Sequence, residues 1–177
     1  MAEEDLAYVE EDLRSPCTQE IAVFRAFAEI VDKADDEIVV IDTAPTGHTL
    51  LLLDATQSYH KEIQKSHGNI PESVKKLLPR LRDEQETEVV IVTLAEATPV
   101  YEAMRLKDDL ARAGINNKWW VINSSLLMTN TQSPLLKTKA LNEIPWINKV
   151  DDLSQGNCAV IPWSGDDIKG KKLKELI

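Results

Sequence analysis

The sequence predicts an α/β fold, an open and mostly parallel sheet with flanking helices. Short β-branched runs alternate with stretches whose apolar residues have helical spacing, which is the pattern of repeated strand-helix-strand units. The run Ile38–Ile41 is apolar at every position, as expected for a parallel strand buried on both faces. Four such strands joined by crossover helices have to lie in one open sheet with right-handed connections.

The first half of the chain begins with an acidic segment. Residues 1–14 are expected to be peripheral, in front of a domain formed by residues 15–177. A helix is predicted over Ser15–Ala34, because Ser15 can be its N-cap and Pro16 its first helical residue. Its apolar face is expected to contain Val23, Phe27, Ile30 and Val31. A strand over 38–42 and a charged amphipathic helix over 72–82 follow.

The second half continues the alternation of strands and helices. Thr98 and Pro99 can begin a helix, and Gly114 can end it. Ser133 and Pro134 are a similar start signal, and the helix that they begin is expected to end near Ile144. The predicted elements are a strand over 88–94, a helix over 98–113, a strand over 118–123, a helix over 133–144, a strand over 158–162 and a helix over 166–177.

Composition narrows the class of protein. The net charge of −10 argues against nucleic acid or an anionic membrane surface as the main partner. The two cysteines, Cys17 and Cys158, give no disulfide framework, which fits a reducing cytosol. No apolar run approaches the ~20 residues of a membrane span. The acidic N-terminus does not have the pattern of a signal peptide.

An aspartate follows the first predicted strand. Open α/β sheets bind ligands at the carboxyl ends of their strands, and nucleotide hydrolases can hold Mg²⁺ there with one acid. Asp42 is therefore a candidate for Mg²⁺ contact, and a helix-capping aspartate is the alternative interpretation. In the turn that follows, Thr46 can contact phosphate or cap the next helix, and Gly47 can let the backbone approach a phosphate or only complete the turn.

The string Asp42-Thr43-Ala44-Pro45-Thr46-Gly47-His48-Thr49 resembles the switch II signature of the ArsA family, the arsenical pump-driving ATPases and their relatives. Four other segments resemble the C-terminal half of that family and occur in the same order: 14–18, 93–99, 120–126 and 133–136. The resemblance covers nearly the whole chain. It implies a nucleotide-binding fold of the P-loop NTPase type, in the subgroup called SIMIBI.

The phosphate-binding loop of that fold does not occur in these residues. No Gly-x-x-x-x-Gly-Lys-Ser/Thr stretch is present, and none of the six glycines precedes a Lys-Ser or Lys-Thr pair. Such a loop needs backbone N–H groups to surround the phosphates and a lysine to reach them. The chain is therefore expected to be the rear part of one ATPase domain, with a sheet that is incomplete at its N-terminal part.

A cysteine lies at the predicted start of the first helix. The positive end of the helix dipole lowers the pKa of a thiol there, and a thiolate suits a soft ion such as As(III) or Sb(III). A small packed side chain is the alternative interpretation of Cys17. The resemblance implies that Cys17, Ser15 and His48 contribute to a metalloid site, with further ligands from the N-terminal half. Cys158 is expected in the core.

An asparagine closes the third predicted strand at the same edge of the sheet. Its amide offers one donor and one acceptor to the edge of a base. The resemblance implies that Asn123 contacts adenine, with Ser124 where the family usually has a second asparagine. Residues 162–165 resemble the loop that covers the base, so Pro162 and Trp163 are expected there. Trp163 can also only fill a surface groove.

The resemblance implies an ATPase that uses Mg²⁺ and ATP, is stimulated by As(III) or Sb(III), and energises a membrane arsenite pump from the cytoplasm. Its partners would be the missing N-terminal half, or a second ATPase domain, and the pump subunit. One alternative is an ATP-dependent targeting factor for tail-anchored membrane proteins, but that class commonly has a Cys-x-x-Cys zinc site, which is absent from these residues. The other alternative, a non-enzymatic metalloid-binding module, would need a fuller set of thiols.

Overall fold

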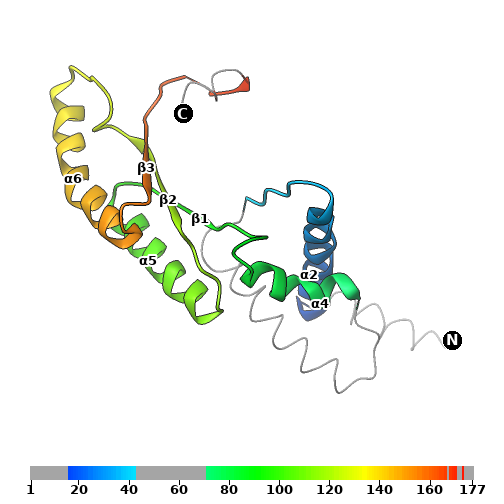
Figure 1. The fold of residues 1–177 in the computed structure, drawn as a ribbon. Coiled ribbons are helices and arrows are strands. Elements are labelled where there is room, and N and C mark those ends of the chain that lie inside the picture. Colours follow the sequence, from blue (N-terminus) through cyan, green and yellow to red (C-terminus); the bar gives the residue numbers. More distant parts are fainter. Residues whose placement is uncertain (1–15, 43–70, 167, 171–172, 174–177) are drawn as a thin grey trace. The chain divides into compact units, whose positions relative to one another are not determined.

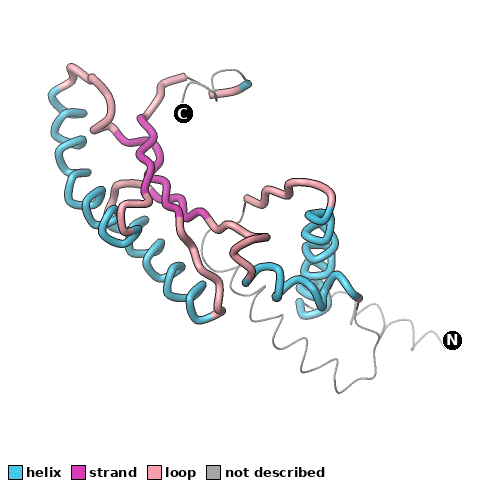
Figure 2. Tube along the Cα trace, viewed as in Figure 1, coloured by secondary structure: helices cyan, strands magenta, loops and turns pink. Residues whose placement is uncertain are grey.

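The structure is a computed structural model that describes residues 16–42, 71–166, 168–170 and 173. The chain divides into two compact units, residues 1–87 and residues 88–177, and each is described by itself. Figure 1 labels their helices and strands, and Figure 2 shows that all of the described strands belong to the second unit.

The first unit contains a pair of packed helices. Helix α2 spans Pro16–Asp32 and continues into a short 3-10 helix, η1 (Lys33–Asp35), and helix α4 spans Glu72–Arg82. The contact between α2 and α4 buries Ala28, Val31, Val74 and Leu77. Both predicted helices are confirmed, and Pro16 is the first helical residue. The expectation for Ile30 was wrong, because its side chain is 49% exposed and Ala28 occupies the buried face instead.

The strand predicted over 38–42 is not formed. These residues have no regular secondary structure, and Ile38 and Val40 are 94% and 88% exposed. A β-strand exists only through backbone hydrogen bonds to a neighbouring strand, and the apolar pattern of a segment cannot supply that neighbour. The described sheet therefore has three strands rather than the four predicted.

Arg80 of α4 connects the elements of the first unit. Its guanidinium donates a hydrogen bond of 3.0 Å to the backbone carbonyl of Val31, at the end of α2. It donates another of 2.7 Å to the Glu86 carboxylate and forms an ion pair with Asp35 of η1. Since only 11% of the Arg80 side chain is exposed, these charge-assisted bonds are partly shielded from water.

Replacing Arg80 by alanine is expected to lower the free energy of unfolding of the first unit by about 2 kcal/mol, because three acceptors lose their donor. Urea unfolding, with hydrogen exchange of the α2 amides, measures the loss. The matched control is Lys75→Ala, which removes only the exposed i,i+3 pair with Glu72 and should leave the free energy of unfolding nearly unchanged. Equal losses in the two variants would contradict the role given to Arg80.

The second unit is a parallel α/β layer. Strands β1 (Val90–Thr93), β2 (Trp119–Ser125) and β3 (Cys158–Pro162) lie in the order β1-β2-β3, and both pairings are parallel. Helices α5 (Ala97–Arg112) and α6 (Pro134–Ser154), both labelled in Figure 1, make the crossovers and pack on the sheet. The predicted parallel sheet and its strands near residues 88–94, 118–123 and 158–162 are confirmed.

The two faces of this sheet differ. Ile91, Trp120 and Ile122 are buried, together with apolar residues of both helices: Val100, Ala103 and Leu110 of α5, and Ala140 and Val150 of α6. On the alternate positions, Val92 is 61% exposed and Trp119 is 43% exposed. Among the described residues of this unit, the core therefore lies on the helix side alone.

Two helix predictions in the second unit were wrong. Helix α6 does not end near Ile144 but passes through Pro145 to Ser154. The ring of Pro145 removes one backbone donor, yet residues on both sides of it, such as Glu143 and Val150, are buried and hold the helix in place. The α-helix predicted over 166–177 is absent from the described residues of that segment, where Gly170 and Leu173 have 3-10 geometry instead. Gly170 has a φ of +58°, which is incompatible with a continuous α-helix.

Candidate nucleotide-base pocket

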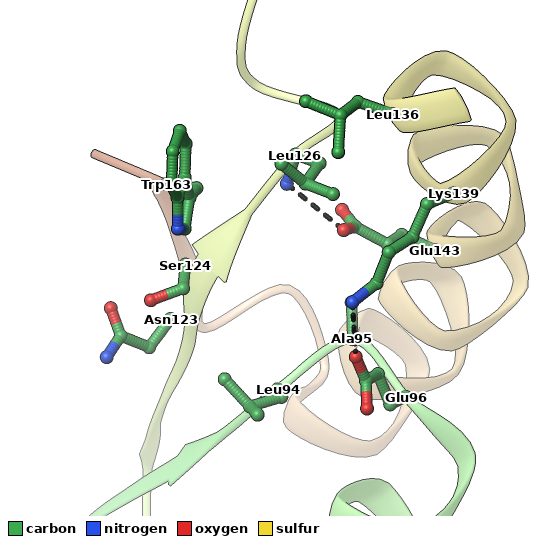
Figure 3. A pocket seen from close by; sticks show the side chains of 10 residues that line it. All are labelled: Leu94, Ala95, Glu96, Asn123, Ser124, Leu126, Leu136, Lys139, Glu143 and Trp163. Carbon is green, nitrogen blue, oxygen red and sulfur yellow. Dashed lines mark hydrogen bonds and ion pairs between the residues drawn. The ribbon is translucent and has the colours of Figure 1, made fainter. Parts of the chain in front are cut away.

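The carboxyl ends of the three strands meet at one edge of the sheet and border a pocket of about 330 Å³. Its walls come from the residues after β1, the end of β2, one face of α6 and the residue after β3, as Figure 3 shows. The lining residues are Leu94, Ala95, Glu96, Asn123, Ser124, Leu126, Leu136, Lys139, Glu143 and Trp163. Of the four residues predicted to lie at one edge, Leu94, Asn123 and Pro162 are at the carboxyl ends of β1, β2 and β3. The fourth, Asp42, belongs to the first unit and does not follow a strand.

A β-bulge shapes the end of β2. Ile122 pairs with Val160 and Ser125 pairs with Pro162, so two residues of β2, Asn123 and Ser124, oppose one residue of β3. A bulge of this kind redirects side chains and is frequent beside functional sites. Ser124 has a φ of 56°, in the left-handed region that residues other than glycine seldom adopt. The two residues of the bulge are both exposed and both line the pocket.

A buried carboxylate holds the chain that leaves the bulge. Glu143 of α6 is 5% exposed, and it accepts a hydrogen bond of 2.7 Å from the Ser125 hydroxyl. The backbone N–H groups of Leu126 and Leu127 donate two more, of 3.0 and 3.1 Å. These donors satisfy a charge that would be costly to bury without partners.

An ion pair forms between two residues that line the pocket. The Lys139 ammonium of α6 lies 3.1 Å from the Glu96 carboxylate, which precedes α5, and Figure 3 draws this contact with a dashed line. Both side chains are about half exposed, so the pair contributes little to stability and can open at small cost. The pair adds one positive and one negative charge to a wall that also contains Asn123, Ser124 and Glu143.

The pocket has the chemistry of a site for a flat, mostly apolar ring with a polar edge. Leu94, Leu136 and Trp163 supply apolar surface, and the exposed amide of Asn123 supplies a donor and an acceptor. Pro162 ends β3 and is not among the lining residues, while Trp163 lines the pocket and remains 50% exposed.

Relieving the backbone strain at Ser124 is expected to stabilise the second unit. Ser124→Asn should raise its free energy of unfolding by about 0.5 kcal/mol, because asparagine tolerates the left-handed region better. Gln155→Asn is the matched control, since Gln155 has the same φ of 56° beyond the end of α6. Ser124→Val should lower stability by about 1 kcal/mol or more. Urea unfolding checks all three, and stabilisation by valine would contradict the assignment of strain.

The other predicted site residues lie in the first unit. Asp42 is described and exposed. Cys17 is the second residue of α2, as predicted, but its side chain lies outside the described part of the chain. Ser15, Thr46, Gly47 and His48 also lie outside the described residues. Their roles therefore remain predictions.

Two further searches concern the described residues only. In those residues, no group of three or more His, Cys, Asp or Glu side chains could hold a metal ion. The helices within the same ranges are all too short or too polar to cross a membrane.

Sequence reasoning missed Glu143 and Lys139. Glu143 is buried in α6, as are the apolar residues Ala140 and Val150. An acidic residue on the apolar face of a helix was the sequence signal that could have identified it. That signal was hidden because the helix was expected to end near Ile144, which left too few turns to define the face.

Known proteins resemble this chain along nearly all of its length. The family model described as anion-transporting ATPase matches residues 1–75 and 53–176. An arsenical pump-driving ATPase of Escherichia coli is 49% identical over 170 residues, which cover 96% of this chain and 29% of that protein. An arsenical pump-driving ATPase of Acidiphilium multivorum is 48% identical over the same shares. The ATPase asna-1 of Caenorhabditis elegans is 29% identical over 63% of this chain and 42% of that protein.

The chain thus spans 29% of the length of these arsenical pump-driving relatives. The match nevertheless extends over both units, and the parallel sheet with its flanking helices agrees with the fold that the resemblance implied. The chain belongs to the ArsA family of anion-transporting ATPases.

Proposed function

We propose that this chain is part of an ATPase that energises a membrane arsenite or antimonite efflux pump, and that it supplies the adenine side of the nucleotide site. The observation that carries the proposal is the pocket at the carboxyl edge of the sheet, with the Asn123 amide beside an apolar wall. Ligands of open α/β sheets bind at this edge. The names of the relatives support ATP hydrolysis and arsenical transport as the whole protein's activity.

Each predicted residue has a role in this proposal. Asn123 reads the adenine edge, Trp163 covers the base directly after Pro162 ends β3, Asp42 holds Mg²⁺, and Thr46 and Gly47 approach the γ-phosphate. Bound Mg²⁺ would neutralise charge on the phosphate oxygens. The loop that surrounds the phosphates and its lysine would come from sequence outside residues 1–177.

The metalloid would bind as substrate or effector at a second site. Cys17, Ser15 and His48 would supply part of its ligands, and the N-terminal half of the longer protein, or a second ATPase domain, would supply the rest. A thiolate ligand suits As(III) and Sb(III) because both are soft ions. The protein would work in the cytoplasm, in peripheral contact with the pump subunit.

Steady-state ATP hydrolysis tests the proposal. The full-length protein that contains these residues should hydrolyse Mg-ATP, and As(III) or Sb(III) should accelerate the reaction. Purified residues 1–177 alone should turn over ATP at less than about one hundredth of that rate, because the phosphate-binding loop supplies much of the phosphate binding. Turnover by the isolated chain that disappears in Asp42→Ala would contradict the need for a separate phosphate loop. ATP hydrolysis without metalloid stimulation would contradict the arsenical part.

A further inference from the structure

The buried carboxylate of Glu143 has no part in the proposed function, yet it is bound to three consecutive residues next to the bulge. Oε2 accepts from the Ser125 hydroxyl at 2.7 Å and from the Leu127 N–H at 3.1 Å, and Oε1 accepts from the Leu126 N–H at 3.0 Å. An apolar side chain would fill the same position in α6 without the cost of burying a charge. The carboxylate is therefore suited to holding this loop.

The bulge is fixed from both sides. On the side of α6, Glu143 holds residues 125–127. On the side of β3, the backbone N–H of Trp163 donates a hydrogen bond of 2.9 Å to the carbonyl of Ser125. Between the paired residues Ile122 and Ser125, the chain has to place Asn123 and Ser124 in the bulge, with Ser124 at a positive φ. Residues held in such conformations persist only where their surroundings over-determine them.

We propose that Glu143 is a positioning residue whose carboxylate holds the bulge so that the Asn123 amide faces the base, and that it thereby sets the preference for adenine over guanine. The inference rests on the proposed function of the pocket. An asparagine amide can pair with both the N6 amino group and the N7 atom of adenine, whereas guanine offers it two acceptors, O6 and N7. The preference therefore depends on how well the amide is held.

A double-mutant cycle in the full-length protein tests this proposal. Calorimetric titrations with ADP and GDP avoid hydrolysis during the measurement. Asn123→Ala should weaken ADP binding about tenfold, as expected for the loss of one bidentate contact. Glu143→Gln keeps the size of the side chain but turns an NH₂ group toward backbone or hydroxyl donors, so the loop loses an acceptor. It should weaken ADP binding about fivefold and GDP binding less than twofold.

The decisive measurement is Glu143→Gln in the Asn123→Ala background. If Glu143 acts through Asn123, the second substitution should change ADP affinity less than twofold, because residues that act as a unit are not additive. Additive effects, or equal losses for ADP and GDP, would overturn the proposal and leave Glu143 as a structural residue. Asn142→Ala, at the exposed neighbouring position of α6, is the control for the helix and should change neither affinity.

The single variants Asn123→Ala and Glu143→Gln distinguish failure of the adenine site from failure of the positioning role. Unchanged ADP binding in Asn123→Ala would overturn the adenine site itself, and with it the proposed function of the pocket. Weakened binding in Asn123→Ala with no effect of Glu143→Gln would overturn only the positioning role. If Glu143→Gln lowers the thermal midpoint too far for titration, Ser125→Ala removes one of the three donors, and the same non-additivity with Asn123→Ala is expected.

Discussion

Replacing Asp42 by asparagine in the full-length protein is expected to lower Mg²⁺-dependent ATP hydrolysis by roughly a hundredfold or more, with or without metalloid. Asparagine keeps the shape of the side chain but removes the negative charge that would attract Mg²⁺ to the phosphates. Asp42 is exposed, so the substitution removes little packing, and the variant should fold as the parent does. Initial rates at several Mg²⁺ concentrations measure the effect.

The matched control is Asp36→Asn. Asp36 is an exposed aspartate that follows η1 and lies outside the switch II string, so its replacement should leave the rate within a factor of two. If Asp42→Asn hydrolyses ATP at the parental rate over the whole Mg²⁺ range, Asp42 is only a turn or capping residue. A rate that recovers at high Mg²⁺ would instead fit a weakened metal contact.

Local sequence signals were sufficient where an element carried its own start, end and apolar face. Helix α4 and strand β3 have the predicted bounds, because each is delimited by turn residues and packs on neighbours inside its own unit. The run Ile38–Ile41 has a stronger β pattern than β1, yet it is not paired. Pairing depends on a partner distant in sequence, and no local pattern specifies that partner.

In the candidate site, too, some features could be predicted from local sequence signals and others could not. The position of Asn123 could be predicted because it closes a predicted strand, and the carboxyl ends of parallel strands share an edge. Trp163 was expected beside it because residues 162–165 resemble a loop of the family. The bulge, the positive φ of Ser124 and the buried Glu143 could not, because they depend on contacts that β2 makes with β3 and α6. Such tertiary contacts override the preferences of single residues, as they do where α6 continues through Pro145.

Replacing Cys17 by serine in the full-length protein is expected to raise the As(III) or Sb(III) concentration for half-maximal stimulation of ATP hydrolysis by roughly tenfold or more, while basal Mg-ATP hydrolysis survives. Serine keeps the size of the side chain but replaces a soft thiolate by a hard, neutral hydroxyl. Cys17 is the second residue of α2, as the sequence predicted for the metalloid ligand.

Cys158→Ser is the matched control for the loss of a thiol. Cys158 is half-buried at the start of β3, and desolvation raises the pKa of its thiol, so it stays protonated at neutral pH and is a poor ligand. Its replacement should leave the stimulation curve unchanged. If Cys17→Ser also leaves that curve unchanged, Cys17 is a packing residue and the metalloid site loses its main ligand. Cys17→Ser is expected to change only the response to metalloid, and Asp42→Asn only the Mg²⁺-dependent hydrolysis. Such different responses would separate the two sites, because a general loss of folding would lower basal hydrolysis and metalloid stimulation together.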